Sequence, residues 1–513
     1  MGAAAGEGDS DGDTYASRMP DADTDAGPEQ PAGPAPGTRI HSFTDDALGT
    51  DDAVALAARV RSGDVSPDEL VAAAIARAEK VDAALHAVAT PMYDRPRTGS
   101  RPTAPLYGVP AFLKDNRDLA GEPTNNGSEA YVARPAESDA PIARQFLSTG
   151  LTVIGKSRMP EFGLNASTEF MTGEPTRNPW DLAYSVGASS GGSAALVAAG
   201  VVPIAHANDG GGSIRIPAAA AGLVGLKPSR GRHRTDHLAR RLPIDLVSEG
   251  VVTRTVRDTA AFLAAIEDDW RNPSLVPVGL VEGPAARRLR VGLLVESFSG
   301  PPDAETDAAV RRAAAALEDA GHVVDEVRLP IDRSFEDDFL RYWGFLAELV
   351  YDTARMMLDR DFDITRADGL GIGLRAYHRR GVHKTPGAIR RLKASALDYA
   401  TLFERHEVIL SPVLRHTTPE LGHLSPTTPF DLLQARLADY VAYTPVQNIT
   451  GTPGISLPLG RTADGRPVGV QLQGAFGDER TLLEVAFLLE EALPFTRIDQ
   501  PDEPSPTRQP ATG

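Results

Sequence analysis

The chain has 513 residues, of which 42% are hydrophobic and 24% are charged, and it contains no cysteine. This composition excludes a small disulfide-stapled scaffold, a wholly disordered chain and every hydrolase that uses a thiolate nucleophile. The 70 acidic residues outnumber the 52 basic ones and leave a net charge of −18. Because an acidic chain repels phosphate backbones, we expect no nucleic acid partner.

The N-terminal residues 1–37 hold eight carboxylates against Arg18 alone, so this segment carries −7 of the −18 charge. It lacks the apolar core of a signal peptide and is too rich in glycine, proline, alanine and aspartate to bury much surface. We expect a disordered acidic tail at 1–37 and a second disordered tail at 501–513. The longest apolar stretch, 194–205, is shorter than the roughly 20 residues of a membrane helix, so we expect a cytoplasmic protein without a membrane partner.

Between the tails, helical and strand patterns alternate. Ser66 to Glu69 form a capping box with Pro67 at the first helical position, which predicts an amphipathic helix. Short apolar runs predict strands at 151–154, 291–295, 408–410 and 468–472, and helical patterns cover 303–320 and 479–493. This alternation predicts an α/β fold around a central sheet. The helical segment 335–402 is either an inserted cap or a set of ordinary core helices, and its spacing leaves both open.

Two motifs match catalytic patterns in a context that argues against them. Gly150 to Ser157 fits the phosphate-binding Walker A pattern, but its inner positions are β-branched and the residues before it look helical. We therefore interpret it as a helix-to-strand turn. Gly187 to Gly191 fits the G-x-S-x-G nucleophile elbow, which must follow a buried strand, and 178–184 does not read as such a strand.

The histidines offer one local pair, His233 and His237, with Asp236 between them. An arginine-rich stretch surrounds this pair and would repel a divalent cation, so we predict a solvated loop and no metal site.

The segment 187–227 differs from its surroundings because two Ser/Gly clusters flank a small-residue apolar helix pattern at 194–200. In the second cluster Gly210, Gly211 and Gly212 precede Ser213. Three successive glycines let backbone N–H groups turn inward together and form an anion-holding concavity beside a serine hydroxyl. The alternative interpretation is a Gly/Ser-rich turn without any chemistry.

A nucleophilic serine needs a base, and only six of the 52 basic residues are lysines. Lys114 follows the strand-like run 107–113, where burial would lower its pKa and favour a neutral amine. Alternatively, Lys114 is a structural lysine paired with Asp115. We expect His206, which lies in an apolar stretch, to be a packed side chain.

At these residues the chain resembles the amidase signature family of serine hydrolases. The resemblance includes 108–116, 187–231, 252–258 and 448–460, and so extends over most of residues 45–495. It implies the amidase-signature fold, with a central mixed twisted sheet covered by helices on both faces, in one domain at 38–500. In that family the triad is a lysine, a serine on a cis peptide bond and a nucleophilic serine 24 positions later, which implies Lys114, Ser189 and Ser213.

The resemblance also implies supporting roles and a reaction. The backbone N–H groups of Gly210, Gly211, Gly212 and Ser213 would form the oxyanion hole, with Ser190, Asp209 and Arg215 in support. The expected reaction is hydrolysis of a small carboxylic amide, and of esters or carbamates by the same acyl transfer, without metal or cofactor. The alternative within the family is the A subunit of a tRNA-dependent amidotransferase. The sequence does not fix the oligomeric state, and a homodimer is one of the alternatives.

The chain departs from the common family pattern at Gly187-Ala188 and at Ala207-Asn208-Asp209, but no catalytic group is lost. The approach 205–209 and the segment 410–421 resemble family members that hydrolyse cyclic nylon oligomers and related synthetic amides.

Overall fold

The structure, a computed structural model, describes residues 35–235 and 241–501. The predicted N-terminal tail up to residue 34, the predicted C-terminal tail from residue 502, and His237 lie outside these residues. Within the described ranges, no helix combines the length and the apolar character needed to cross a membrane.

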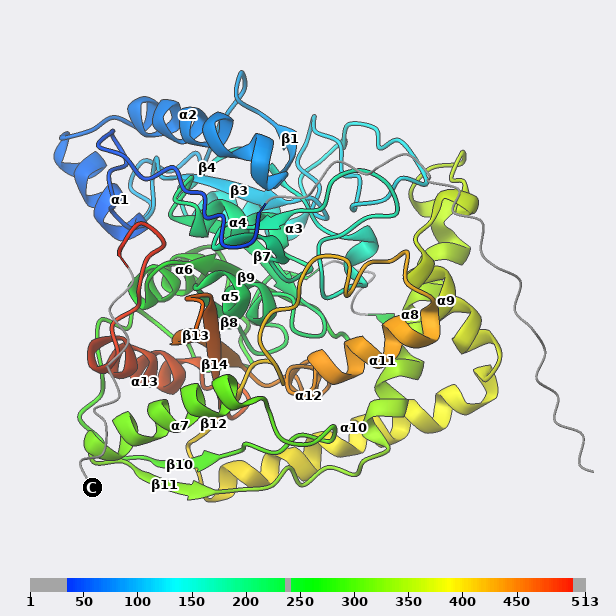
Figure 1. Ribbon diagram of the computed structural model, residues 1–513. Helices are drawn as coiled ribbons and strands as arrows, with labels where there is room; N and C mark the ends of the chain where they lie inside the picture. The colour runs from blue at the N-terminus through cyan, green and yellow to red at the C-terminus, as the bar shows by residue number, and fades with distance from the viewer. Residues whose placement is uncertain (1–34, 236–240, 502–513) are drawn as a thin grey trace, which may run out of the picture. The chain divides into compact units, whose positions relative to one another are not determined.

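A mixed sheet of 12 strands organises the fold (Figure 1). Strand β2 pairs with β4 beside the main path, and β5 and β6 form a separate two-stranded sheet. In spatial order the main path is β1 (Val88–Pro91), β4 (Thr152–Ser157), β3 (Pro110–Lys114), β7 (Ile204–Asp209), β9 (Ser248–Thr253), β8 (Val224–Lys227), β13 (Gly454–Arg461), β14 (Pro467–Gly474), β12 (Val408–Pro412), β10 (Arg290–Leu293) and β11 (Val323–Glu326). The remaining strands are β2 (Arg97–Thr98), β5 (Arg177–Asn178) and β6 (Asp181–Ser185).

Helices flank the sheet, so the predicted α/β class with a mixed central sheet is confirmed. Helices α2 and α4 pack on β3, α6 packs on β8 and β9, and α5, α7 and α13 pack on β13 and β14. The α-helices are α1 (Ala53–Ser62), α2 (Pro67–Leu85), α3 (Pro141–Ser148), α4 (Gly191–Ala198), α5 (Arg215–Ala221), α6 (Val256–Asp269), α7 (Ala304–Asp319), α8 (Phe335–Met357), α9 (Gly369–Arg379), α10 (Thr385–Ala400), α11 (Phe430–Tyr440), α12 (Pro445–Thr450) and α13 (Glu479–Ala492).

Local signals explain several of these boundaries. The Ser66 side chain accepts from the Glu69 N–H while the Glu69 carboxylate accepts from the Ser66 N–H, so the predicted capping box begins α2. Asp303 caps α7 in the same region where the helical pattern begins. The predicted strands at 151–154, 291–295, 408–410 and 468–472 correspond to β4, β10, β12 and β14.

The two suspect motifs have different outcomes. The Walker-like segment is the expected turn, because α3 ends at Ser148 and β4 contains Gly155, Lys156 and Ser157. A strand does precede Gly187, since β6 ends at Ser185, but it is not the buried strand that a nucleophile elbow needs, because Ala183 and Tyr184 are only partly buried. Unlike the strand of a nucleophile elbow, β6 belongs to the two-stranded sheet and not to the central one.

The segment 335–402 consists of α8, α9 and α10, joined by the short 3₁₀ helices Ile364–Arg366 and Val382–Lys384 (Figure 1). Helix α8 contacts both α9 and α10. The interpretation of this segment as an inserted cap stays a prediction.

Candidate active site

Lys114 ends β3 in a fully buried position. Its Nζ donates to the Ser189 Oγ at 2.6 Å and to the Asn208 Oδ1 at 2.7 Å. Burial lowers the pKa of Lys114 to about 7, although the charge of Glu249 acts in the opposite direction. A large fraction of this side chain is therefore a neutral amine near pH 7, which is the form that can accept a proton.

Lys114 does not pair with Asp115, as the alternative interpretation required. The Asp115 carboxylate lies 2.8 Å from the Nζ of Lys156, a buried lysine that also donates to Thr124. The neighbouring ion pair therefore leaves Lys114 without a carboxylate partner among the described residues.

Ser189 follows a cis peptide bond from Ala188 and lies just before α4. The next residue, Ser190, contacts the backbone of Asn208 twice, because its Oγ is 3.3 Å from both the Asn208 N and the Asn208 O. Ser190 thus fixes the segment that carries Ser189 against the end of β7.

The glycine segment leaves β7 directly after Asp209 and enters α5 after Ser213. The Gly212 N–H donates to the Asp209 Oδ1 at 2.7 Å. The N–H groups of Gly210, Gly211 and Ser213 have no acceptor within the described protein. These three donors are thus available for an anion, whereas the Gly212 N–H is already engaged.

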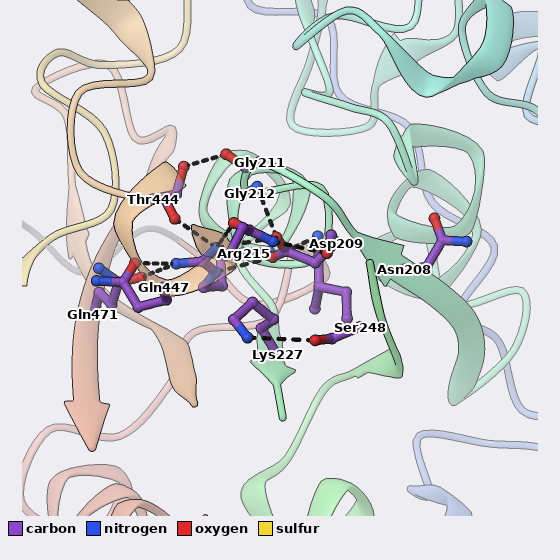
Figure 2. Close-up of polar contacts among 12 residues, drawn as sticks. Asn208, Asp209, Gly211, Gly212, Arg215, Lys227, Ser248, Thr444, Gln447 and Gln471 are labelled. Carbon is purple, nitrogen blue, oxygen red and sulfur yellow. Dashed lines mark hydrogen bonds and ion pairs between the residues drawn. The ribbon is translucent and has the colours of Figure 1, made fainter. Parts of the chain in front are cut away.

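Asp209 and Arg215 form a fully buried ion pair beneath this loop, with Nε to Oδ2 at 2.9 Å. Although burial alone would raise the pKa of Asp209, the charge of Arg215 lowers it to about 2. Figure 2 shows Arg215 at the centre of the cluster, while the side chain of Asn208 points away from it. The other acceptors of the guanidinium are Gln447 Oε1, Gln471 Oε1, Asn448 Oδ1 and the Thr444 carbonyl, at 2.6 to 2.9 Å.

Ser213 faces a cavity of about 370 Å³. Gly211 and Gly163 also line it, and a Cβ placed on Gly163 would lie 3.0 Å from the Ser189 Oγ. Among the described residues, no hydrogen bond joins Ser189 and Ser213. Ser213 thus lines the cavity, whereas Ser189 lies beside the cavity-lining Gly163 and is the serine that bonds directly to Lys114.

Aromatic side chains of α8 form a wall of the cavity beside the glycine loop. Phe335, Phe339 and Trp343 are stacked in succession, with ring centroids 6.3 and 5.6 Å apart. The rings of Phe339 and Trp343 lie next to Gly210 and Gly211. A substrate held by the loop would therefore contact an apolar and aromatic surface.

Sequence reasoning missed the role of Asn208, which accepts from Lys114 and exchanges hydrogen bonds with Asn116. It also missed Asn448, whose Nδ2 donates to both Asp209 oxygens of the loop, the carbonyl and Oδ1. Both were visible as amides within matched segments, but a spacing pattern does not specify which strand lies beside which.

Of the two histidines whose environment was predicted from the sequence, His233 is more buried than expected. His206 is packed as expected, with its ring edge-on to Phe146. The prediction of a solvated loop is wrong at His233, which is 2% exposed and whose ring nitrogens have no hydrogen-bond partner among the described residues. Burial lowers its pKa to about 4. No group of side chains suited to a metal occurs in the described part of the chain.

The family model described as Amidase matches residues 69–483, which include every residue of the candidate site. The chain belongs to the amidase family. The amidase homologue named AmiC from Mycobacterium tuberculosis is 48% identical over 470 residues, covering 91% of this chain and 99% of its own. The 6-aminohexanoate-cyclic-dimer hydrolase of Paenarthrobacter ureafaciens is 34% identical over 478 residues, covering 86% and 95%.

Solved structures show the same fold. A structure of 6-aminohexanoate cyclic dimer hydrolase has a TM-score of 0.79 at 32% identity, covering 88% of this chain and 98% of its own. The A subunit of the glutamyl-tRNA(Gln) amidotransferase of Thermotoga maritima is a more distant neighbour, at 24% identity and a TM-score of 0.69, and shows the fold alone. The chain is thus an amidase, an enzyme that hydrolyses the C–N bond of amides.

Proposed function

We propose that this amidase forms an acyl-enzyme on Ser213, with Ser189 and Lys114 as the proton relay. The neutral amine of Lys114 accepts the proton of Ser189, and Ser189 accepts the proton of Ser213. The Ser213 Oγ bonds to the amide carbonyl carbon, and the N–H groups of Gly210, Gly211 and Ser213 stabilise the oxyanion. The C–N bond then breaks as the relay returns the proton to the leaving amine.

In the second half of the reaction, water replaces the amine. The relay removes a proton from the water, whose oxygen bonds to the acyl carbon while the Ser213 ester bond breaks. The relay passes the proton taken from water to the Ser213 oxygen. The products are a carboxylic acid and the free enzyme, with both serine hydroxyls and the neutral lysine amine restored. The same steps would cleave esters and carbamates.

One observation carries this proposal: the buried Nζ of Lys114 lies 2.6 Å from the Ser189 Oγ, with its pKa lowered by burial to about 7. A lysine in water, with a pKa of 10.5, would hold its proton and could only donate. Removing the charged form is what turns the side chain into a general base. The shared cavity of Ser213 and Gly163 supports the second step, which requires the Ser213 hydroxyl to rotate towards Ser189.

The cavity indicates the substrate. Its volume of about 370 Å³ suits a small molecule, and its aromatic wall on α8 favours an uncharged amide with an apolar or aromatic group. Cyclic amides are included, because a relative that covers most of this chain is named as a cyclic-dimer hydrolase.

The test is covalent labelling with a fluorophosphonate, followed by mass analysis of the labelled peptide, together with turnover of a simple anilide. We expect the label on Ser213, and S213A and K114A should each lower kcat by at least about a thousandfold. Replacement of the exposed Ser100 and Lys80 by alanine provides matched controls that should retain wild-type kcat. Label on Ser189, or anilide turnover that survives S213A, would contradict the proposal.

A further inference from the structure

The buried carboxylate of Glu249 lies close to the proposed base but has no part in the proposed relay. Glu249 is on β9 and pairs in register with Asn208 on β7, the residue that accepts from Lys114. Its side chain is 6% exposed, and Arg117 forms an ion pair with it. Although burial alone would raise the pKa of Glu249, the Arg117 guanidinium and the His206 hydrogen bond hold it well below the ordinary value. Glu249 is thus a permanent negative charge inside the protein.

His206 connects this charge to Lys114. The backbone N–H of Lys114 donates to the His206 Nδ1 at 3.4 Å, and the His206 Nε2 lies 3.0 Å from the Glu249 Oε2. Since Nδ1 accepts, the proton is on Nε2 and is donated to Glu249. Burial lowers the pKa of His206, so the ring is neutral and transmits orientation without adding a charge. The chain Glu249–His206–Lys114 thereby fixes the last residue of β3.

Within the part of the chain that the structure describes, three charged groups act on the Lys114 amine. Glu249 and Asp209 favour its protonation, and Arg117 opposes it. Asp209 is neutralised by its buried ion pair with Arg215. The other titratable or charged groups packed around this network are Asp115 with Lys156, His206, His233 and Asp245. Glu249 and Arg117 are therefore the opposed pair whose balance acts on the amine.

We propose that Glu249 is a positioning residue of the amidase reaction: through His206 it holds Lys114 in place, and with Arg117 it sets the pH at which Lys114 becomes an active base. This inference rests on the proposed function of Lys114. The inference predicts that the charges of Glu249 and Arg117 have opposite effects on the protonation of Lys114. Loss of the Glu249 charge disfavours the ammonium, whereas loss of the Arg117 charge favours it.

The experiment measures kcat/KM for an anilide against pH in the full-length enzyme and in E249Q and R117Q. The acid limb of the wild-type profile reports protonation of Lys114. In E249Q this midpoint should move to lower pH, and in R117Q to higher pH, each by about one unit. The control E267Q removes a different buried carboxylate, which pairs with Arg232 and is not among the charged groups that act on Lys114, and should keep the wild-type midpoint.

Opposite shifts in E249Q and R117Q would support the inference, because loss of packing alone would lower the rate without moving the two midpoints apart. Midpoints that coincide with that of E267Q, or that move in the same direction, would overturn it. If E249Q does not fold, the shift in R117Q decides: an upward shift supports the inference and an unchanged midpoint overturns it. A wild-type profile without an acid limb would instead remove the proposed function itself, and this inference with it.

Discussion

At the scale of single residues, the site depends on a lysine kept without a counter-ion. Lys114 has an amide, Asn208, where a carboxylate would complete an ion pair. An amide oxygen accepts a hydrogen bond from either form of the amine but does not stabilise the ammonium as a charge would. Burial lowers the pKa of Lys114 to about 7, and a neutral hydrogen-bond partner leaves that effect in place where a carboxylate would oppose it.

The neutrality of Asn208 predicts the effect of N208D, a nearly isosteric change. It would place a negative charge 2.7 Å from the Lys114 Nζ and raise the pKa of Lys114. We expect the acid limb of kcat/KM to move to higher pH by at least about one unit. The rate at pH 7 would fall and recover in alkaline buffer.

The control for N208D is N208A, which removes the acceptor without adding charge. It should lower the rate without moving the acid limb upward. An acid limb in N208D at the wild-type position would show that Lys114 does not control the rate.

The residue types of the site follow from the sequence, but their partners do not. The scarcity of lysines and the polyglycine run drew attention to Lys114 and Ser213, and the family resemblance then implied their roles. The contacts of Lys114 with Ser189 and Asn208 bridge 75 and 94 positions. Such contacts depend on β3 lying beside β7, and local spacing contains no information about that adjacency.

At the scale of elements, the loop between β7 and α5 has two kinds of glycine. A Cβ on Gly210 would meet no atom closer than 3.5 Å, and its φ is not positive. Gly212 has a φ of 132°, and a Cβ there would lie 2.3 Å from the Thr444 Oγ1. Only Gly212 is required by the backbone itself.

We therefore expect different outcomes for two alanine variants. G210A should fold with kcat within about threefold of wild type, because it keeps its N–H and meets no clash. G212A should destabilise the protein by about 2 kcal/mol or more and displace the donors of the oxyanion hole. Thermal unfolding and anilide turnover, measured on both variants, check this. Equal losses in the two variants would mean that the backbone of the loop differs from the one described.

Predictions of elements succeeded where the signal was local. The capping box at Ser66 and the cap at Asp303 fix where α2 and α7 begin. The strand before Gly187 was missed because β6 is short, partly exposed and stabilised by its hairpin partner β5. The burial of His233 was missed because the arginines around it suggested solvent, whereas Arg232 is itself buried against Glu479 and Glu267.

At the scale of the whole molecule, the described fold buries two lysines without a carboxylate within ion-pair distance. Lys114 serves the proposed reaction, but Lys227 donates only to the Pro228 carbonyl and, weakly, to the Ser248 Oγ, beneath the Asp209 and Arg215 pair (Figure 2). Burial lowers the pKa of Lys227 to about 7. On folding, Lys227 must therefore either release its proton or bury its charge. Either event lowers the free energy of unfolding by an amount that depends on pH.

The destabilising effect of burying Lys227 should become smaller as the pH rises above 7. Between about pH 7 and 10.5, the unfolded chain binds a proton at Lys227 that the folded protein has released. The free energy of unfolding therefore rises with pH across this window, with a slope on the order of 1 kcal/mol per pH unit from this residue.

The variant K227M tests this, because it removes the pH-dependent contribution of Lys227 and leaves that of Lys114. We expect the difference in Tm, K227M minus wild type, to be largest near pH 7 and to decrease as the pH approaches 10. The exposed Lys80, replaced by methionine, should give a constant difference. Parallel Tm curves for K227M and wild type would show that Lys227 keeps its ordinary pKa in the folded protein.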